Sequence, residues 1–204
     1  MKENKLAFFL LLVLAFEILF YTATEARSRG FLEDRSCSSL PSGVAWVNNW
    51  RQDFTFECQN SYSIRTWRSQ HRNCQEDRIH YFECSHCPMR NQNNDCSYTA
   101  DFGNEYDKTL SFKCPLNGFV TRVSSTYNSY YKDRKFSFRC CRNYRYCAYD
   151  CQVTHLLNGW DQELNYRIPV GYFLVGARSE HNNHYEDRRW KFEICRFTNV
   201  CTKK

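Results

Sequence analysis

Three Asp-Arg pairs are the residues of this chain whose type and spacing most suggest a chemical role. They are Asp77-Arg78, Asp133-Arg134 and Asp187-Arg188, and their starts lie 56 and 54 residues apart. Each pair opens an aromatic-rich stretch that ends at a cysteine, namely Cys84, Cys140 and Cys195. Recurrence at this regular interval predicts three copies of one structural unit.

If these stretches are strands, each arginine lies on an apolar face, because alternate residues of a strand point the same way. Arg188, for example, is in phase with Trp190 and Phe192. An unpaired buried charge is costly, so each arginine needs a partner, which the neighbouring aspartate or a ring of carbonyl groups would supply. The alternative is an arginine that binds a ligand in three equivalent sites. The pattern favours the structural role.

Other residues that do chemistry form no convincing signature. The histidines match neither a catalytic triad nor a zinc site, which normally needs three or four ordered ligands; they are His71, His80, His86, His155, His181 and His184. Cys84-Ser85-His86-Cys87 resembles a zinc knuckle, but an oxidising compartment favours disulfides. We therefore expect no enzymatic activity, no metal and no cofactor.

Each repeat reads as three strands. One ends near the first cysteine of the repeat, one lies in the middle, and one is the Asp-Arg stretch; the middle segments are Ile64–Trp67, Phe119–Val123 and Tyr172–Val175. Aromatic and β-branched residues at a period of two are typical of half-buried strands. No convincing amphipathic helix follows the leader, so the sequence predicts an all-β fold.

The 13 cysteines indicate a secreted, disulfide-bonded protein. Cys58 and Cys84 bracket the first repeat, and Cys114 with either Cys140 or Cys141 brackets the second. Ile168 stands at the opening position of the third repeat, so Cys195 must pair elsewhere, and the segment 140–151 between repeats two and three supplies several candidates. An odd count leaves at least one thiol that is free or bonded to another chain.

The first 26 residues have the pattern of a signal peptide, with a basic start, an apolar run and small residues before Ala26. The run is shorter than the roughly 20 apolar residues that span a bilayer. Residues 27–44 form an expected N-terminal tail and residues 45–204 the domain. Without Lys2, Lys5, Glu3, Glu17 and Glu25, the 28 basic and 22 acidic residues become 26 and 19, a formal charge of +7. This mild excess favours sulfated glycans, anionic lipids or acidic matrix over nucleic acid.

Polar loops precede the three Asp-Arg stretches, at residues 69–76, 125–132 and 179–186. Tyrosines beside amides and charges suit sugars or flat protein surfaces, since the ring stacks and polar groups orient the ligand. The candidate binding residues are Tyr127, Tyr130, Tyr131, His181 and His184. The alternative is that these tyrosines only cap the sheet edge. Three equivalent loops would make the protein multivalent.

From about Ala45 to Cys201 the chain resembles the dermatopontin family of tyrosine-rich matrix proteins. The resemblance is carried by Trp46-Val47-Asn48, Arg51-Gln52, Phe54, the three Asp-Arg stretches, and Cys140-Cys141-Arg142 with Cys147 and Cys151. It implies the disulfides Cys58–Cys84, Cys114–Cys141, Cys96–Cys140, Cys151–Cys195 and Cys147–Cys201. Cys37, Cys74 and Cys87 have no place in that frame; two can bridge each other, which leaves one for a disulfide-linked homodimer.

The resemblance also implies a class of function without enzymatic activity. We expect a secreted all-β domain of three pseudo-repeats, about 45–87, 100–141 and 157–197, arranged as a three-sheet prism and held by disulfides. The favoured role is an extracellular matrix or adhesion protein that links cells, collagen-type fibrils or acidic glycans. Its partners would be matrix proteins, proteoglycans or cell-surface glycans. The alternative is a carbohydrate-binding agglutinin or cell-aggregation factor of innate defence, and a venom cytotoxin ranks last.

Overall fold

The computed structural model describes residues 15–22, 36–87, 95–98 and 102–201. The chain divides into two units, Met1–Ser39 and Leu40–Lys204. In the first, residues 15–22 and 36–38 are helical. Most of the expected leader, its cleavage site after Ala26 and much of the expected tail lie outside the described residues. The second unit is built from strands.

The described part of the second unit holds eleven strands, so the predicted all-β class is confirmed. In chain order they are β1 Phe54–Glu57, β2 Tyr62–Arg72, β3 Asp77–His86, β4 Asp95–Tyr98, β5 Leu110–Lys113, β6 Phe119–Asn128, β7 Asp133–Arg142, β8 Cys147–Val153, β9 Leu164–Arg167, β10 Phe173–Asn182 and β11 Asp187–Thr198. Each repeat contributes one short strand and one long hairpin. Strands β4 and β8 were not expected from the sequence.

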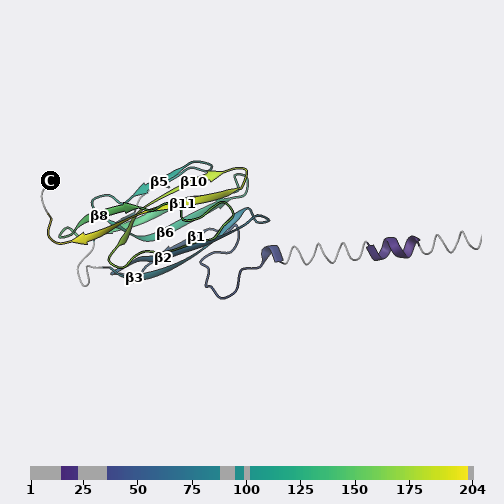
Figure 1. Ribbon diagram of the computed structural model, residues 1–204, viewed down its shortest axis with the longest axis horizontal. Coiled ribbons are helices and arrows are strands. Elements are labelled where there is room, and N and C mark those ends of the chain that lie inside the picture. The colour runs from purple at the N-terminus through teal and green to yellow at the C-terminus, as the bar shows by residue number, and fades with distance from the viewer. Residues whose placement is uncertain (1–14, 23–35, 88–94, 99–101, 202–204) are drawn as a thin grey trace, which may run out of the picture. The chain divides into compact units, whose positions relative to one another are not determined.

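The short strands do not pair within their own repeats. The three sheets have the orders β1-β6-β7-β4, β5-β10-β11-β8 and β3-β2-β9. Thus β1 joins the hairpin of the second repeat, β5 that of the third, and β9 that of the first. Figure 1 shows β5, β10 and β11 on one side, β2 and β3 on the other, and β6 between them. Each repeat therefore completes the sheet of another.

One core unites the three sheets. Alternate residues of each long hairpin point into the core, and many of them are aromatic. Trp67, Phe136 and Trp190 are examples and are at most 1% exposed. The Trp67 and Trp190 rings lie 5.0 Å apart, and Phe136 meets Trp190 edge-on at 4.9 Å. Because these residues come from three repeats, no repeat can bury its own apolar face alone.

The three buried arginines pair with aspartates of other repeats. Arg78 bonds Asp187, Arg134 bonds Asp77 and Arg188 bonds Asp133, and Nε–Oδ1 distances are 2.5–2.6 Å. In each pair Nη2 also bonds Oδ2, so the contacts are bidentate. All six residues are at most 4% exposed. The structural role predicted for the arginines fits this arrangement, but the partner is not the neighbouring aspartate in the sequence.

Three asparagines, 30 residues before the arginines, anchor the approach to each short strand. Asn104 Nδ2 donates to the Arg134 carbonyl, and its Oδ1 accepts from the Phe136 N–H. Asn48 and Asn158 make the same two bonds in the other repeats. This recurrence was not among the features predicted from the sequence, although the spacing of the asparagines is the same as that of the Asp-Arg pairs.

The disulfides correct part of the pairing that the family resemblance implies. Cys114 pairs with Cys140 and Cys96 with Cys141, so the expected Cys114–Cys141 and Cys96–Cys140 are wrong. Adjacent strand residues face opposite ways: Cys140 points into the main core beside Cys114, whereas Cys141 lies opposite Cys96 in the β4–β7 ladder. Cys58–Cys84, Cys147–Cys201 and Cys151–Cys195 also form.

The three cysteines outside the implied frame differ in their bonding state. Cys37 and Cys74 are both disulfide-bonded. Cys87 is a thiol with 1% exposure. The disulfide-linked homodimer stays a prediction, and a link through Cys87 would first require its side chain to become exposed.

Replacing Arg134 by Met should destabilise the domain by about 3–5 kcal/mol, because Asp77 would stay buried without its cation. The matched control is Arg68→Met, which breaks a surface pair with Glu163 and should change the unfolding free energy by less than about 1 kcal/mol. Denaturant unfolding with disulfides intact measures both. Equal effects of the two substitutions would contradict the dependence of the fold on the buried Arg–Asp pairs.

The cysteine pairing predicts a difference between two double variants. Cys96→Ser with Cys141→Ser should remove one complete disulfide and leave only the Cys87 thiol to titrate in denaturant. Cys96→Ser with Cys140→Ser should break two disulfides and expose further thiols or misfold. The reverse pattern in a thiol titration would restore the pairing implied by the resemblance.

Candidate functional site

The turns of the three long hairpins gather at one end of the domain, which we call the loop end. They comprise residues 73–76, 129–132 and 183–186. Lys132 Nζ lies 2.8 Å from Glu76 Oε1 and 3.7 Å from Glu186 Oε1, so one ion-pair cluster joins all three turns. The polar loops expected from the sequence are shorter in the structure, because their first four residues belong to strands.

Two of the turns carry a stacked aromatic pair beside a cation. Tyr131 stacks on Tyr106 with ring centroids 5.0 Å apart, and Lys135 Nζ lies 4.7 Å from the Tyr106 ring. In the third repeat Tyr185 stacks on Trp160 at 5.4 Å, and the Arg189 guanidinium lies 4.3 Å from the Trp160 ring. We call these the aromatic platforms. Tyr131 and Tyr185 are 41% and 38% exposed, so each platform faces solvent.

The first repeat has diverged from this pattern. Trp50 occupies the position of Tyr106 and Trp160 but is only 8% exposed, with the Arg72 guanidinium 4.9 Å from its ring. Its turn contains the disulfide-bonded Cys74 and Gln75 where the other turns have aromatic residues. The loop end therefore presents two comparable platforms, whereas the sequence had suggested three equivalent loops.

The candidate binding residues named from the sequence separate into two groups. Tyr130, Tyr131 and His184 lie exposed on the turns, and Tyr130 contacts Tyr131 edge-on. Tyr127 and His181 lie in β6 and β10 instead, beside Arg134 and Arg188 in the ladders. Burial and the nearby Asp77 charge raise the pKa of Tyr127 to about 12. Tyr127 and His181 thus contribute to the packing between repeats.

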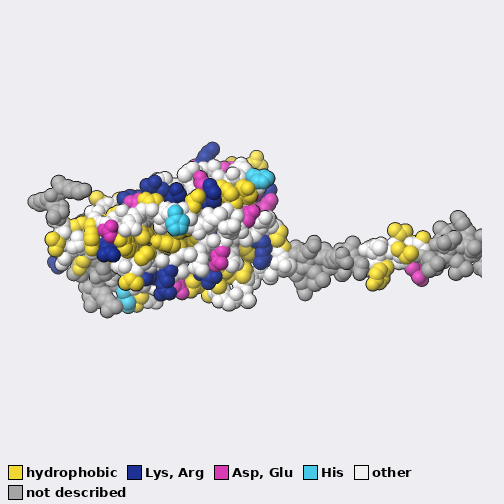
Figure 2. Space-filling model, in the orientation of Figure 1, with side chains coloured by type: hydrophobic (Ala, Val, Ile, Leu, Met, Phe, Trp, Pro, Cys, Tyr) yellow, Lys and Arg dark blue, Asp and Glu magenta, His cyan; other side chains and the backbone are white. Residues whose placement is uncertain are grey.

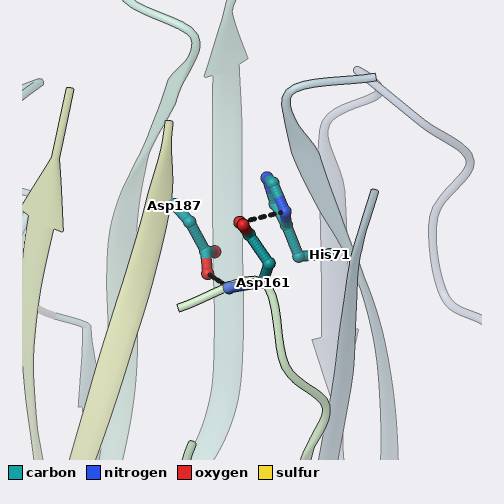
Figure 3. A group of neighbouring side chains, drawn as sticks. All are labelled: His71, Asp161 and Asp187. Atoms are coloured by element: carbon teal, nitrogen blue, oxygen red, sulfur yellow. Dashed lines mark hydrogen bonds and ion pairs between the residues drawn. The ribbon is translucent and has the colours of Figure 1, made fainter. Parts of the chain in front are cut away.

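His71 occupies the equivalent position in the first repeat and contacts Asp161 of the third (Figure 3). His71 Nδ1 lies 3.1 Å from Asp161 Oδ1, and the Asp161 N–H donates to Asp187 Oδ2. His181 makes longer contacts with Asp107 and Asp133, at 3.5 and 3.8 Å. A histidine and two carboxylates can hold a cation, but Asp187 already accepts three N–H groups. The geometry favours ion pairing between repeats.

His80 is the most perturbed histidine of the described residues. It is fully buried, and its pKa is lowered well below the usual value by burial first and then by Arg134 and Arg78. Trp67 Nε1 donates to its Nδ1 at 3.1 Å. The neutral imidazole is therefore the form that the core accommodates.

Sequence analysis missed the inner members of the platforms, Tyr106 and Trp160. A repeated signal was available, because both follow an asparagine by two residues, in Asn104-Glu105-Tyr106 and Asn158-Gly159-Trp160. Trp50 follows Asn48 in the same way. All three lie 28 residues before the arginine of their repeat, so extending the Asp-Arg alignment upstream brings them into register.

Charges of both signs are interspersed on the surface. On the face shown in Figure 2, basic and acidic side chains alternate and do not gather into one basic patch. No helix among the described residues is both long and apolar enough to cross a bilayer. The mild positive charge of the chain is thus spread along its surface on this side.

Comparison with known proteins matches this architecture to one family. The dermatopontin family model matches residues 48–200, which include the three Asp-Arg repeats. The chain belongs to the dermatopontin family. It matches no solved structure.

Relatives within the dermatopontin group differ in their named activities. The chain is 37% identical to the hemagglutinin/amebocyte aggregation factor of Limulus polyphemus, over 79% of this chain and 93% of that protein. It is 30% identical to the dermatopontin of Biomphalaria glabrata, over 74% and 100%. It is 33% identical to Millepora cytotoxin-1 of Millepora dichotoma, over 73% of this chain and 65% of that protein.

The comparisons support an extracellular role of the adhesion or agglutinin type, and secretion with it. The dermatopontin family is one of matrix proteins without enzymatic activity.

Because the pKa of His80 is lowered in the folded state, unfolding takes up a proton below the usual histidine pKa of about 6.5. The unfolding free energy should therefore decrease as the pH falls below about 6.5, by at most about 1.4 kcal/mol per pH unit from this residue. His80→Phe copies Phe136 of the second repeat and should flatten the slope in that range. Urea unfolding between pH 7 and 5 would measure it, and an unchanged slope would contradict the assignment to His80.

Proposed function

We propose that the protein is a secreted, non-catalytic adhesion protein that binds glycans of cells or matrix through the two aromatic platforms. The observation that carries the proposal is a repeated arrangement: an exposed tyrosine stacks on an inner ring, and a cation, Lys135 or Arg189, contacts that inner ring. An aromatic face suits the apolar face of a sugar. Lys135 and Arg189 are ion-paired with Glu105 and Glu180, so each platform has a cation and a carboxylate nearby that can orient the polar groups of a glycan.

Two platforms at one end favour binding to a single surface. When one platform binds, the other is held at the same end of the domain and thus at high effective concentration, so the affinity for a dense glycan layer should exceed that of either site. Bridging two cells then requires a second copy of the chain, because both platforms lie at the loop end. Agglutination by this protein should therefore depend on self-association.

The named activity of the Limulus relative makes cell clumping the natural assay. We expect the mature chain to agglutinate red cells, and Tyr131→Ala with Tyr185→Ala to lower the titre at least about tenfold. Loss of one aromatic contact costs about 1 kcal/mol, and two linked sites multiply the effect. The matched control is Tyr149→Ala, an exposed tyrosine on β8 near the other end of β11.

Competitors separate the classes of ligand. Inhibition by one simple sugar would indicate a carbohydrate-binding agglutinin, whereas inhibition only by heparin or salt would indicate acidic glycans. Lysis or dye leakage from vesicles would point to the cytotoxin class and contradict the proposal. An equal loss in the Tyr149 control would show that the platforms are not the site.

Self-association is measured separately by sedimentation of the mature chain. We expect an oligomer at concentrations that agglutinate cells. A strict monomer that still agglutinates would show that binding surfaces exist on more than one face, contrary to an arrangement with both platforms at the loop end.

A further inference from the structure

A small cavity lies within the ring of Arg-Asp pairs, and we call it the arginine cavity. All three buried arginines line it, together with the buried side chains of His80 and Trp190. Its volume is about 20 Å³. A single water needs about 10–15 Å³ on the same scale, so the cavity has room for one water or one monatomic ion.

Four hydrogen-bond donors that line this cavity have no hydrogen-bond partner among the described residues. They are Nη1 of Arg134, Nη1 of Arg188, Nε1 of Trp190 and Nε2 of His80. Their residues are at most 3% exposed, so solvent does not compensate for them. A buried polar group left unsatisfied is costly, which makes four in one place an indication of a bound acceptor.

His80 presents a donor here because its tautomer is determined by the opposite nitrogen. An indole N–H can only donate, so the bond from Trp67 Nε1 makes His80 Nδ1 an acceptor. In the neutral ring the hydrogen then lies on Nε2. The low pKa of His80 is consistent with this neutral form.

The three aspartates around the cavity are already engaged. Each aspartate accepts Nε and Nη2 of its arginine and one backbone N–H, from Arg51, Asp107 or Asp161. Ser69 Oγ lies 3.4 Å from Arg78 Nη1. The equivalent hydroxyls of Ser125 and Ser179 are buried without a hydrogen-bond partner among the described residues. Each could accept one N–H from its arginine, but Nη1 carries two. At the solvent end, Lys132 is paired with Glu76, and Glu186 lies 3.7 Å from the same amine.

We propose that the arginine cavity binds one small monovalent anion, such as chloride. A halide accepts several N–H donors at once, whereas a water accepts two and must also donate. The charges of the three arginines and three aspartates cancel. An anion in the cavity is therefore not repelled by a net negative charge around it. This site holds the repeats together and is independent of the aromatic platforms.

Thermal unfolding of the full mature chain tests the site. At constant ionic strength, the midpoint should increase and saturate when chloride or bromide replaces gluconate, which is too large for the cavity. His80→Phe removes one donor and should raise the half-saturating halide concentration about tenfold or more. His184→Phe, the same change on an exposed turn, should leave it unchanged. A midpoint independent of halide, or one that His80→Phe does not alter, would overturn the proposal.

Crystals of the unaltered protein grown in bromide provide a test that needs no variant. An anomalous peak within hydrogen-bonding distance of Arg134 and Arg188 Nη1 would support the site. An ordered water only, without an anomalous signal, would overturn it. Trp190→Phe serves as a second variant for the thermal measurement if His80→Phe does not fold.

Discussion

The closed cycle of buried ion pairs is the interaction on which the rest of the structure depends. Asp77 bonds the arginine of the second repeat, Asp133 that of the third, and Asp187 that of the first. Taking six charges out of water is unfavourable unless each finds a partner in good geometry. Because every partner belongs to another repeat, no repeat can satisfy its own charges. The cycle therefore requires all three repeats to assemble together, and the exchange of the short strands imposes the same condition through backbone hydrogen bonds.

Disulfides reinforce this exchange at equivalent positions. Cys58–Cys84 and Cys114–Cys140, both with a separation of 26 residues, tie the segment after a short strand to the hairpin of its own repeat. Each bond thus joins two sheets. In the third repeat Ile168 and Ile194 occupy the corresponding positions and are buried, so apolar packing replaces the covalent link there. Cys96–Cys141 and Cys151–Cys195 instead fasten the edge strands β4 and β8.

The three repeats share the buried residues that hold the fold together and differ in the exposed turns that could bind a ligand. The aspartates, arginines and asparagines of the frame are the same in all three, since each is buried and bonded. The exposed turns differ, and only the second and third keep an aromatic platform with a cation. An adhesion role on this frame needs no cleft, because its ligand-facing groups project from turns that the rigid hairpins position.

The sequence by itself determined the all-β class, the three repeats and the long strands, because a period-two pattern and a repeat near 55 residues are local signals. It also indicated Tyr130, Tyr131 and His184 as exposed candidates. Pairing partners were beyond its reach: strand exchange, the aspartate opposite each arginine and the choice between Cys140 and Cys141 depend on which faces meet across the core. For the same reason Tyr127 and His181 resembled surface residues in the sequence. Only the tertiary structure, by placing residues of different repeats around one core, decided that they pack between repeats and that Tyr106 and Trp160 support the exposed tyrosines.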